Sequence, residues 1–209
     1  MTQLIILINV AAFLLQLAVG DPAIDALGLW PLALGSSGIA PTHGSLYTVA
    51  PFHLWQLLTY SLLHSGWVHL AFNMWGLYLF GRDIENEIGA MRLLALYVGS
   101  AFSAGLTQLL VTSLIFPSPY PTVGASGGVF GLLFAFAVLF PRRTVILLIP
   151  PVPLPAWLFA TLYGIAELAL GVSGSLNGVA HFAHVGGMLG SALLMLYWRQ
   201  HSREQRARG

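Results

Sequence analysis

The sequence contains no cysteine and few charged residues, and both absences narrow what the chain can be. Without cysteine there is no disulfide framework, no cysteine-ligated metal and no cysteine nucleophile. Only 7% of the 209 residues are charged and 57% are hydrophobic, whereas a soluble domain carries about 25% charged residues. So little charge cannot coat a water-facing surface, and the lipid bilayer is therefore the expected solvent for much of the chain.

Other features are missing as well. The net charge is only +1 and no basic patch with interleaved aromatic residues occurs, which argues against a nucleic-acid partner. There is no H-E-x-x-H motif, as a zinc protease would have, and no pair of facing carboxylates, as an aspartyl mechanism requires. The apolar amino-terminal stretch lacks a basic start, so it is interpreted as a retained span rather than a cleaved signal.

Six apolar segments come close to the length of about 20 residues that a transmembrane helix needs. The sequence therefore predicts an all-α membrane protein, a six-helix transmembrane bundle in one domain (residues 1–198) with a basic cytoplasmic tail (residues 199–209). The fourth segment is short, which indicates a helix that starts below the outer surface. The expected spans are Leu4–Val19, Leu62–Phe80, Arg92–Phe116, Ala125–Phe140, Pro155–Val172 and Gly178–Trp198.

The basic residues predict the orientation. All eight are arginine, and with six spans they all fall after the second span, after the fourth span or in the carboxyl-terminal tail. Because positive charge marks the cytoplasmic side, both termini are expected in the cytoplasm and the protein in the plasma or inner membrane. Ser126 and His184 then lie near the outer ends of their spans, at comparable depth, in a site that opens outward.

The longest outer loop, Gly20–Ser61, is rich in aromatic residues, and Asp21 and Asp25 are its only charges. Such aromatic residues favour the membrane interface, so part of the loop is expected in the outer leaflet. The alternative is a loop that packs on the helix ends. On the cytoplasmic side, prolines are expected to keep the connection Ile149–Pro155 out of helix until the fifth span starts.

A serine and a histidine inside apolar spans need a reason, because hydroxyl and imidazole groups are costly in hydrocarbon. Ser126 alone would be interpreted as a helix N-cap, and His184 alone as a core histidine bonded to backbone. Small residues repeat at i, i+4 on both spans, however, and predict two smooth stripes that pack closely. These are Gly127, Gly131 and Ala135 on the fourth span, and Ala183, Gly187 and Ser191 on the sixth.

Close packing of these stripes is expected to bring the Ser126 hydroxyl within reach of the His184 imidazole, as a base-activated nucleophile requires. His181 precedes His184 by three residues, but this spacing alone is a weak metal signal. Glu167 is the only acidic residue inside a span, and it is expected on a helix from which it does not pair with the histidines. No acidic or cysteine ligand then completes a zinc set, so neither a metal nor a cofactor is expected.

The second span carries His64, His69 and Asn73. His69 and Asn73 are four residues apart and share one helical face, so their N–H groups can converge on one point. Each donor aimed at a developing oxyanion contributes about 3 kcal/mol. The alternative is hydrogen bonding that only holds the bundle together.

Three motifs together resemble those of the rhomboid intramembrane serine proteases. They are Gly124-Ala125-Ser126-Gly127 on the fourth span, His69-Leu70-Ala71-Phe72-Asn73 on the second, and Ala183-His184-Val185-Gly186-Gly187 on the sixth. The resemblance covers nearly the whole chain, and Gly81-Arg82-Asp83-Ile84-Glu85 resembles the family's cytoplasmic turn after the second span. The chain looks like a minimal six-span prokaryotic form.

The resemblance implies a serine–histidine dyad with no aspartate, in which Ser126 is the nucleophile and His184 is the general base and acid. It also implies an oxyanion hole made by His69, Asn73 and the Ser126 backbone N–H. The implied substrates are transmembrane segments, cut near their outer ends without metal or cofactor, which enter between spans two and five. The expected supporting residues are Gly124, Gly127, Phe130, His181 and Gly187.

Two positions depart from the family's pattern. Trp55-Gln56 stands where many members have Trp-Arg, and this arginine is not catalytic, so activity is expected to survive. Phe130 stands where relatives often carry a tyrosine under the histidine; its ring can still stack on imidazole, without a hydroxyl.

Two other functions are possible in principle. A rhomboid-like pseudoprotease would bind membrane proteins without cutting them, and the intact Ser126 and His184 argue against it. A solute or metal transporter would use the histidines, and the lack of internal repeats argues against it.

Overall fold

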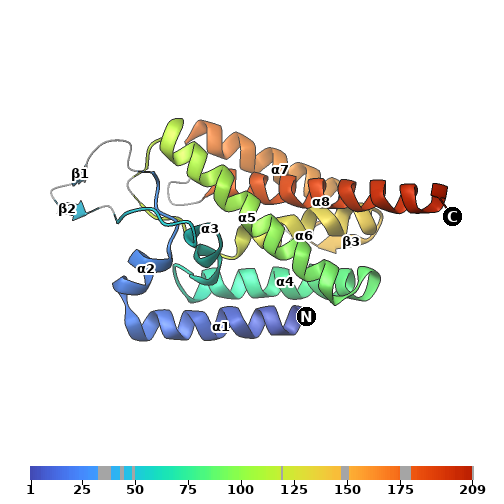
Figure 1. Ribbon diagram of the computed structural model, residues 1–209, viewed down its shortest axis with the longest axis horizontal. Helices are drawn as coiled ribbons and strands as arrows, with labels where there is room; N and C mark the ends of the chain where they lie inside the picture. The colour runs from blue at the N-terminus through green and yellow to red at the C-terminus, as the bar shows by residue number, and fades with distance from the viewer. Residues whose placement is uncertain are drawn as a thin grey trace.

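The computed structural model describes residues 1–32, 39–42, 45–48, 50–118, 120–146, 151–174 and 180–208. In Figure 1 the chain ends lie toward one side of the molecule, and the short elements of the long loop lie on the other. The long elements are all helices: α1 (Thr2–Val19), α4 (Trp67–Ile88), α5 (Ala90–Leu114), α6 (Ser126–Leu139), α7 (Ala156–Ser173) and α8 (His181–Arg208).

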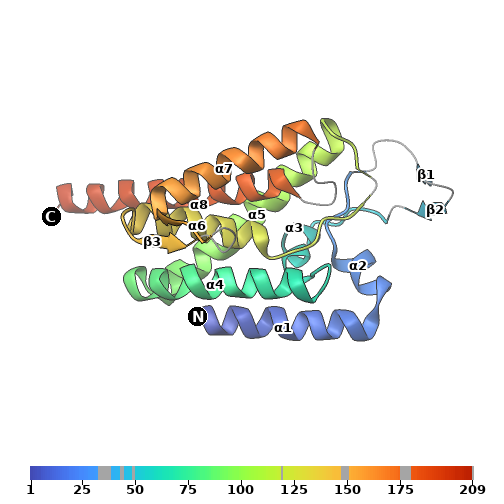
Figure 2. The ribbon, with the colours of Figure 1, turned by 180° about the vertical axis from the view of Figure 1, so that it is seen from behind.

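Helix α6 forms the centre of the bundle. It is buried along most of its length and contacts α4, α5, α7 and α8; Figure 2 shows it between α4 and α7. Leu77, Leu96 and Leu132 pack in the core around it. Large apolar side chains such as Phe72 and Ile165 point outward and are exposed, as expected of helices whose surroundings are lipid rather than water.

Apolar helices of membrane-spanning length are present, as predicted. Helices α1, α5 and α7 are long and apolar enough to cross a membrane, and α6 is a shorter apolar helix. Helices α4 and α8 start apolar but carry charged residues toward their carboxyl ends, among them Arg82, Glu85 and Arg199. The number of crossings therefore stays a prediction.

The expected start of the second span is wrong by five residues. Leu62 ends a short 3-10 helix, η1 (Tyr60–Leu62), and α4 begins only at Trp67. The backbone at Leu63 and Gly66 is extended, so His64 lies before α4 rather than on it. Apolar composition continues through this stretch, which is why hydropathy alone does not mark the break.

Helices α4 and α8 also run further than expected. The segment Gly81–Glu85, expected as a turn, is part of α4, because nothing interrupts the helix before Gly89, where φ is +87°. Helix α8 passes Trp198 and continues to Arg208, since residues 199–208 contain no glycine or proline. Gly178, the expected start of the sixth span, lies outside the described residues.

The described part of the long outer loop contains α2 (Asp21–Leu27), an antiparallel pair β1 (Ile39–Thr42) and β2 (Ser45–Thr48), α3 (Gln56–Thr59) and η1. Helix α2 contacts α1, α3 contacts α5, and η1 contacts α1 and α6, whereas β1 and β2 lie away from the long helices (Figure 1). Trp30 and Tyr60 are buried, and the Tyr60 hydroxyl donates to the Ala101 carbonyl at 2.8 Å. Whether other aromatic residues enter the outer leaflet stays a prediction.

Gln56 is completely buried within this loop. Its side-chain oxygen accepts hydrogen bonds from the backbone N–H groups of His53 at 3.2 Å and Trp30 at 3.4 Å. The neighbouring Trp55 indole donates to the Ala26 carbonyl at 2.9 Å. The neutral Gln56 amide therefore links separate parts of this loop by hydrogen bonds.

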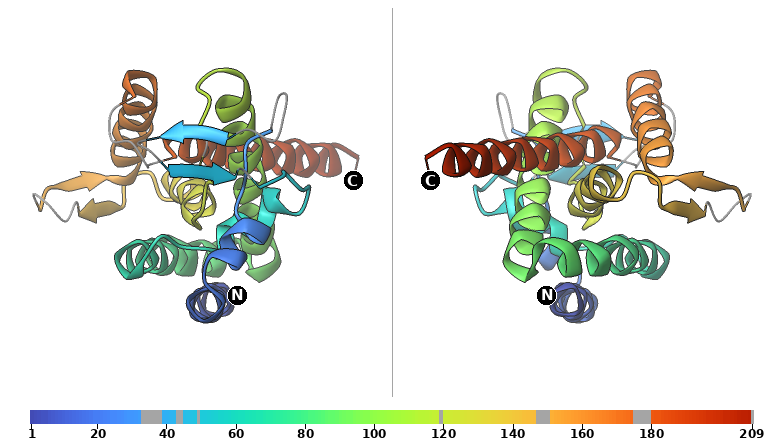
Figure 3. Two further views of the ribbon diagram at one scale, coloured as in Figure 1. Left: turned by 90° about the vertical axis from the view of Figure 1, so that its left-hand side faces the viewer. Right: turned by 90° about the vertical axis from the view of Figure 1, so that its right-hand side faces the viewer.

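The connection between α6 and α7 has a short β-strand at each end. Strands β3 (Thr144–Ile146) and β4 (Pro153–Pro155) pair antiparallel and project from the helices (Figure 3). Helix α7 starts directly after Pro155, in agreement with the expected effect of the prolines. Residues 147–150 lie outside the described part of the chain.

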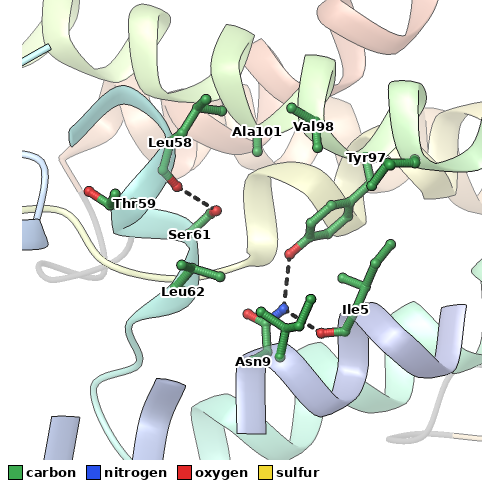
Figure 4. Close-up of a pocket in the computed structure, with 11 residues that line it drawn as sticks. Ile5, Asn9, Leu58, Thr59, Ser61, Leu62, Tyr97, Val98 and Ala101 are labelled. Atoms are coloured by element: carbon green, nitrogen blue, oxygen red, sulfur yellow. Dashed lines mark hydrogen bonds between the residues drawn. The ribbon is translucent and has the colours of Figure 1, made fainter. Parts of the chain in front are cut away.

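An apolar groove lies between α1 and α5 (Figure 4). Asn9 is one of its polar lining residues, and its amide donates to the Ile5 carbonyl at 2.9 Å and to the Tyr97 hydroxyl at 3.4 Å. Neither Ser126 nor His184 lines this groove, so it is separate from the candidate site.

Candidate active site

Ser126 and His184 are in hydrogen-bond contact. His184 Nε2 lies 2.8 Å from Ser126 Oγ. Ser126 is the first residue of α6, and His184 lies in the first turn of α8, so the contact forms where these two helices begin. The serine is half-buried and the histidine is buried.

Small residues let the two helices approach backbone to backbone. A Cβ atom added to Gly187 would lie only 2.0 Å from the Gly127 carbonyl oxygen, which is far inside van der Waals contact. Helix α5 supplies a further close surface that the sequence stripes do not reveal: a Cβ on Gly131 would lie 2.0 Å from Ser100 Oγ, and one on Gly127 would lie 2.4 Å from the Ala104 Cβ.

Phe130 fixes the plane of the histidine ring. Its ring stacks on His184 with centroids 4.1 Å apart and an interplanar angle of 3°. Tyr163 of α7 also stacks on Phe130, with centroids 5.1 Å apart. The stack that the sequence allows for a phenyl ring is therefore present, and it connects α6 to α7 and α8.

Glu167 corrects one expectation from the sequence, namely that it does not pair with the histidines. It is buried on α7, and its Oε2 atom lies 2.6 Å from His181 Nδ1 and 2.9 Å from His184 Nδ1. Its presence near the outer end of the fifth span was visible in the sequence. The rotation of α7 about its axis, which turns this carboxylate toward α8, was not.

The same three side chains have the chemistry of a metal site. Glu167, His181 and His184 each offer one ligand atom, and these atoms lie within 4.8 Å of one another. The reasoning that no acidic ligand stands near the two histidines is therefore wrong. The contacts at 2.6 and 2.9 Å have hydrogen-bond length.

His69 faces the space beside the serine. Its Nδ1 accepts the Ser65 backbone N–H at 3.3 Å, so the ring proton of the neutral imidazole lies on Nε2. A Cβ on Gly124 would lie 2.9 Å from His69 Nε2 and 3.7 Å from Ser126 Oγ. Gly124 also has φ +134°, so both its backbone conformation and this space require glycine.

Asn73 is buried one turn after His69 on the same face of α4. Its amide nitrogen donates to the His69 carbonyl at 3.0 Å, which leaves its second N–H for another acceptor. The His64 ring packs edge-on against His69 at 5.2 Å. Both His64 ring nitrogens are buried without a hydrogen-bond partner among the described residues.

Comparison with known proteins places these residues in a family. Residues 51–201 match the family model described as the Rhomboid domain. The chain is 34% identical over 146 residues to "Rhomboid protein 1, mitochondrial" of Saccharomyces cerevisiae, which covers 69% of this chain and 42% of that protein. It is 33% identical over 144 residues to "Rhomboid protease GluP" of Bacillus subtilis, with 68% and 25% covered.

A third relative aligns over almost the whole chain. "Rhomboid protease GlpG" of Yersinia pestis is 29% identical over 206 residues, which cover 95% of this chain and 62% of that protein. The chain thus spans less than two thirds of the length of each of these three relatives. Because the family model covers well over half of the chain and includes the helices that carry Ser126, His184 and His69, the chain belongs to the rhomboid family of integral membrane proteins.

Proposed function

We propose that the protein is an intramembrane serine endopeptidase that cleaves transmembrane segments of membrane proteins near their outer ends. The observation that supports this most is the 2.8 Å contact between His184 Nε2 and Ser126 Oγ. A serine becomes a strong nucleophile when a base stands within hydrogen-bond reach. The stack of His184 on Phe130 supports the proposal because it fixes the base in one orientation.

In the proposed reaction, Ser126 Oγ attacks the scissile carbonyl carbon while its proton moves to His184 Nε2. The carbonyl π electrons move to the oxygen and form the oxyanion. The C–N bond then breaks, and the leaving nitrogen takes the proton from His184 Nε2. Water hydrolyses the resulting ester in the same way, with His184 as base and then as acid.

The oxyanion needs hydrogen-bond donors beside Ser126, and three are available. His69 Nε2–H faces the space over Gly124 next to the serine hydroxyl. The second amide N–H of Asn73 and the backbone N–H of Ser126 complete the proposed oxyanion hole. Each donor lowers the barrier only where the negative charge develops, by about 3 kcal/mol.

We place six membrane crossings on α1, α4, α5, α6, α7 and α8, in one domain that comprises residues 1–198. Both termini face the cytoplasm, residues 199–209 form a basic tail, and the site opens to the outside of the plasma or inner membrane. Two observations support this orientation. The arginines lie near the junction of α4 and α5, between α6 and α7, and in the last part of α8, and both chain ends lie on the side away from the long loop (Figure 1).

The substrate is a membrane protein, and α4 and α7 flank the path by which its helix enters toward α6. The names of the bacterial relatives GluP and GlpG as proteases support this class of reaction. The reaction as written uses no metal, cofactor or nucleic acid, and their absence stays a prediction.

Covalent labelling by a fluorophosphonate probe tests the proposal. The purified wild-type protein is expected to form a stable serine adduct, because the probe requires a nucleophile activated by a base. Ser126→Ala should lose the label completely. Ser202→Ala, which removes an exposed serine at the far end of α8, should label like the wild type.

Two outcomes of this experiment would contradict the proposal. Label that persists in Ser126→Ala would place the nucleophile elsewhere. A folded wild-type protein that takes no label would favour a pseudoprotease, which binds membrane proteins without cutting them.

A further inference from the structure

A buried carboxylate lies against the histidine on the side opposite the serine. Glu167 Oε2 is 2.9 Å from His184 Nδ1, and His184 Nε2 is 2.8 Å from Ser126 Oγ. The imidazole therefore stands between a hydroxyl on α6 and a carboxylate on α7. Only 6% of the Glu167 surface is exposed, so the charge of this group is compensated by its neighbours rather than by bulk water.

His181 holds the carboxylate in place. Its Nδ1 makes a hydrogen bond of 2.6 Å to Glu167 Oε2, and His181 itself is buried one turn before His184 on α8. The contact of the same oxygen with His184 Nδ1 is short, but that N–H does not point along the line to the oxygen. It is therefore an electrostatic contact rather than an aligned hydrogen bond.

We infer that Glu167 is a positioning residue for His184, so that the site works as a serine–histidine–glutamate triad rather than as a dyad. The inference rests on the function proposed above. A carboxylate beside Nδ1 favours the tautomer with the proton on Nδ1. The lone pair on Nε2 is then free to accept the Ser126 proton.

The positions of the protons during the reaction support the same role. When Ser126 Oγ bonds to the carbonyl carbon, its proton goes to Nε2 and His184 becomes an imidazolium. The Nδ1 proton stays on His184, and Glu167 stays ionised throughout. The carboxylate stabilises the positive charge that exists only after proton transfer, so its effect falls on the chemical step rather than on substrate binding.

The spacing of the cluster favours this role over that of a metal site. Two ligands of one tetrahedral zinc ion stand about 3.3 Å apart when each bond is near 2.0 Å. The nitrogen–oxygen distances to Glu167 are 2.6 and 2.9 Å, which is the spacing of hydrogen-bond partners. A zinc ion would require Glu167 to move away from both histidines.

The decisive variant is Glu167→Gln, which keeps the shape of the side chain and removes its charge. We expect kcat for cleavage of a reconstituted transmembrane substrate to fall by about 10²-fold, with KM and the thermal midpoint little changed. Glu87→Gln makes the same chemical change at an exposed position near the end of α4, and should behave like the wild type. A purely structural role would instead lower the thermal midpoint.

The outcomes separate this inference from the proposed function. If the wild type cleaves, Ser126→Ala does not, and Glu167→Gln keeps the wild-type kcat, then the triad is wrong and the proposed function stands. If the wild type does not cleave, both are wrong. Stoichiometric zinc in the purified wild type that is lost in Glu167→Gln would make the carboxylate a metal ligand and overturn the triad.

A measurement on the wild type covers the case in which Glu167→Gln does not fold. Nitrogen-15 NMR of histidine-labelled protein reports which ring nitrogen of His184 carries the proton. The triad predicts a protonated Nδ1 and an unprotonated Nε2 in the resting protein. The opposite tautomer would overturn it.

Discussion

Replacement of His184 by alanine is expected to lower kcat for substrate cleavage by about 10⁴- to 10⁶-fold. In the proposed reaction His184 Nε2, which lies 2.8 Å from Ser126 Oγ, takes the hydroxyl proton, and this variant removes that acceptor. The measurement is turnover of a reconstituted transmembrane substrate, with substrate in excess. His201→Ala, at an exposed position near the carboxyl end of α8, is the matched histidine control and should keep the wild-type rate.

A double variant makes the same prediction sharper. Residues that act as one unit have effects that do not add, so Ser126→Ala combined with His184→Ala should be no slower than either single variant. Cleavage by His184→Ala at a rate near that of the wild type would exclude His184 as the base, whatever the other variants show.

The second large effect is expected from Gly187→Ala. The new Cβ would lie 2.0 Å from the Gly127 carbonyl oxygen, which belongs to backbone and cannot rotate away. Helices α6 and α8 must then move apart, at a cost of about 1–3 kcal/mol or more. Because Ser126 and His184 stand on these helices, cleavage should fall by about 10²-fold or more.

Gly164→Ala is the control for this substitution. It makes the same change on α7, where the new Cβ meets only the flexible end of Met188, with the sulfur at 3.3 Å and Cε at 3.6 Å. Thermal unfolding in detergent and the cleavage rate are measured for both variants. An unaltered thermal midpoint and rate in Gly187→Ala would mean that the close approach of α6 and α8 does not position the site.

The main helices could be predicted because apolar runs of membrane-spanning length leave few alternatives. The approach of α6 to α8 could be predicted as well, since Gly127 and Gly187 each belong to a stripe of small residues. The ends of the helices were harder to predict from the sequence. Hydropathy does not distinguish the extended backbone around His64 from the start of α4. It marks the change to polar residues after Trp198, but it does not show that helix α8 continues there.

The contacts of His184 show which features of the site the sequence determines and which it does not. The stack on Phe130 follows from a spacing within α6 and from the aromatic character of the residue, so it could be anticipated. The contact with Glu167 depends on how α7 rotates about its own axis, and that rotation is set by packing against α6 and α8, not by local sequence. The contributions of Ser100 and Ala104 on α5 were missed for the same reason.

The central claim is that the Ser126 hydroxyl on α6 attacks a peptide bond while its proton moves to the His184 ring on α8. The most direct measurement is cleavage of a purified transmembrane substrate in liposomes by the wild type and by Ser126→Ala, with the products identified by mass spectrometry. The wild type should cut once, near the outer end of the substrate helix, and Ser126→Ala should give no product. Equal cleavage by the two proteins would contradict the account.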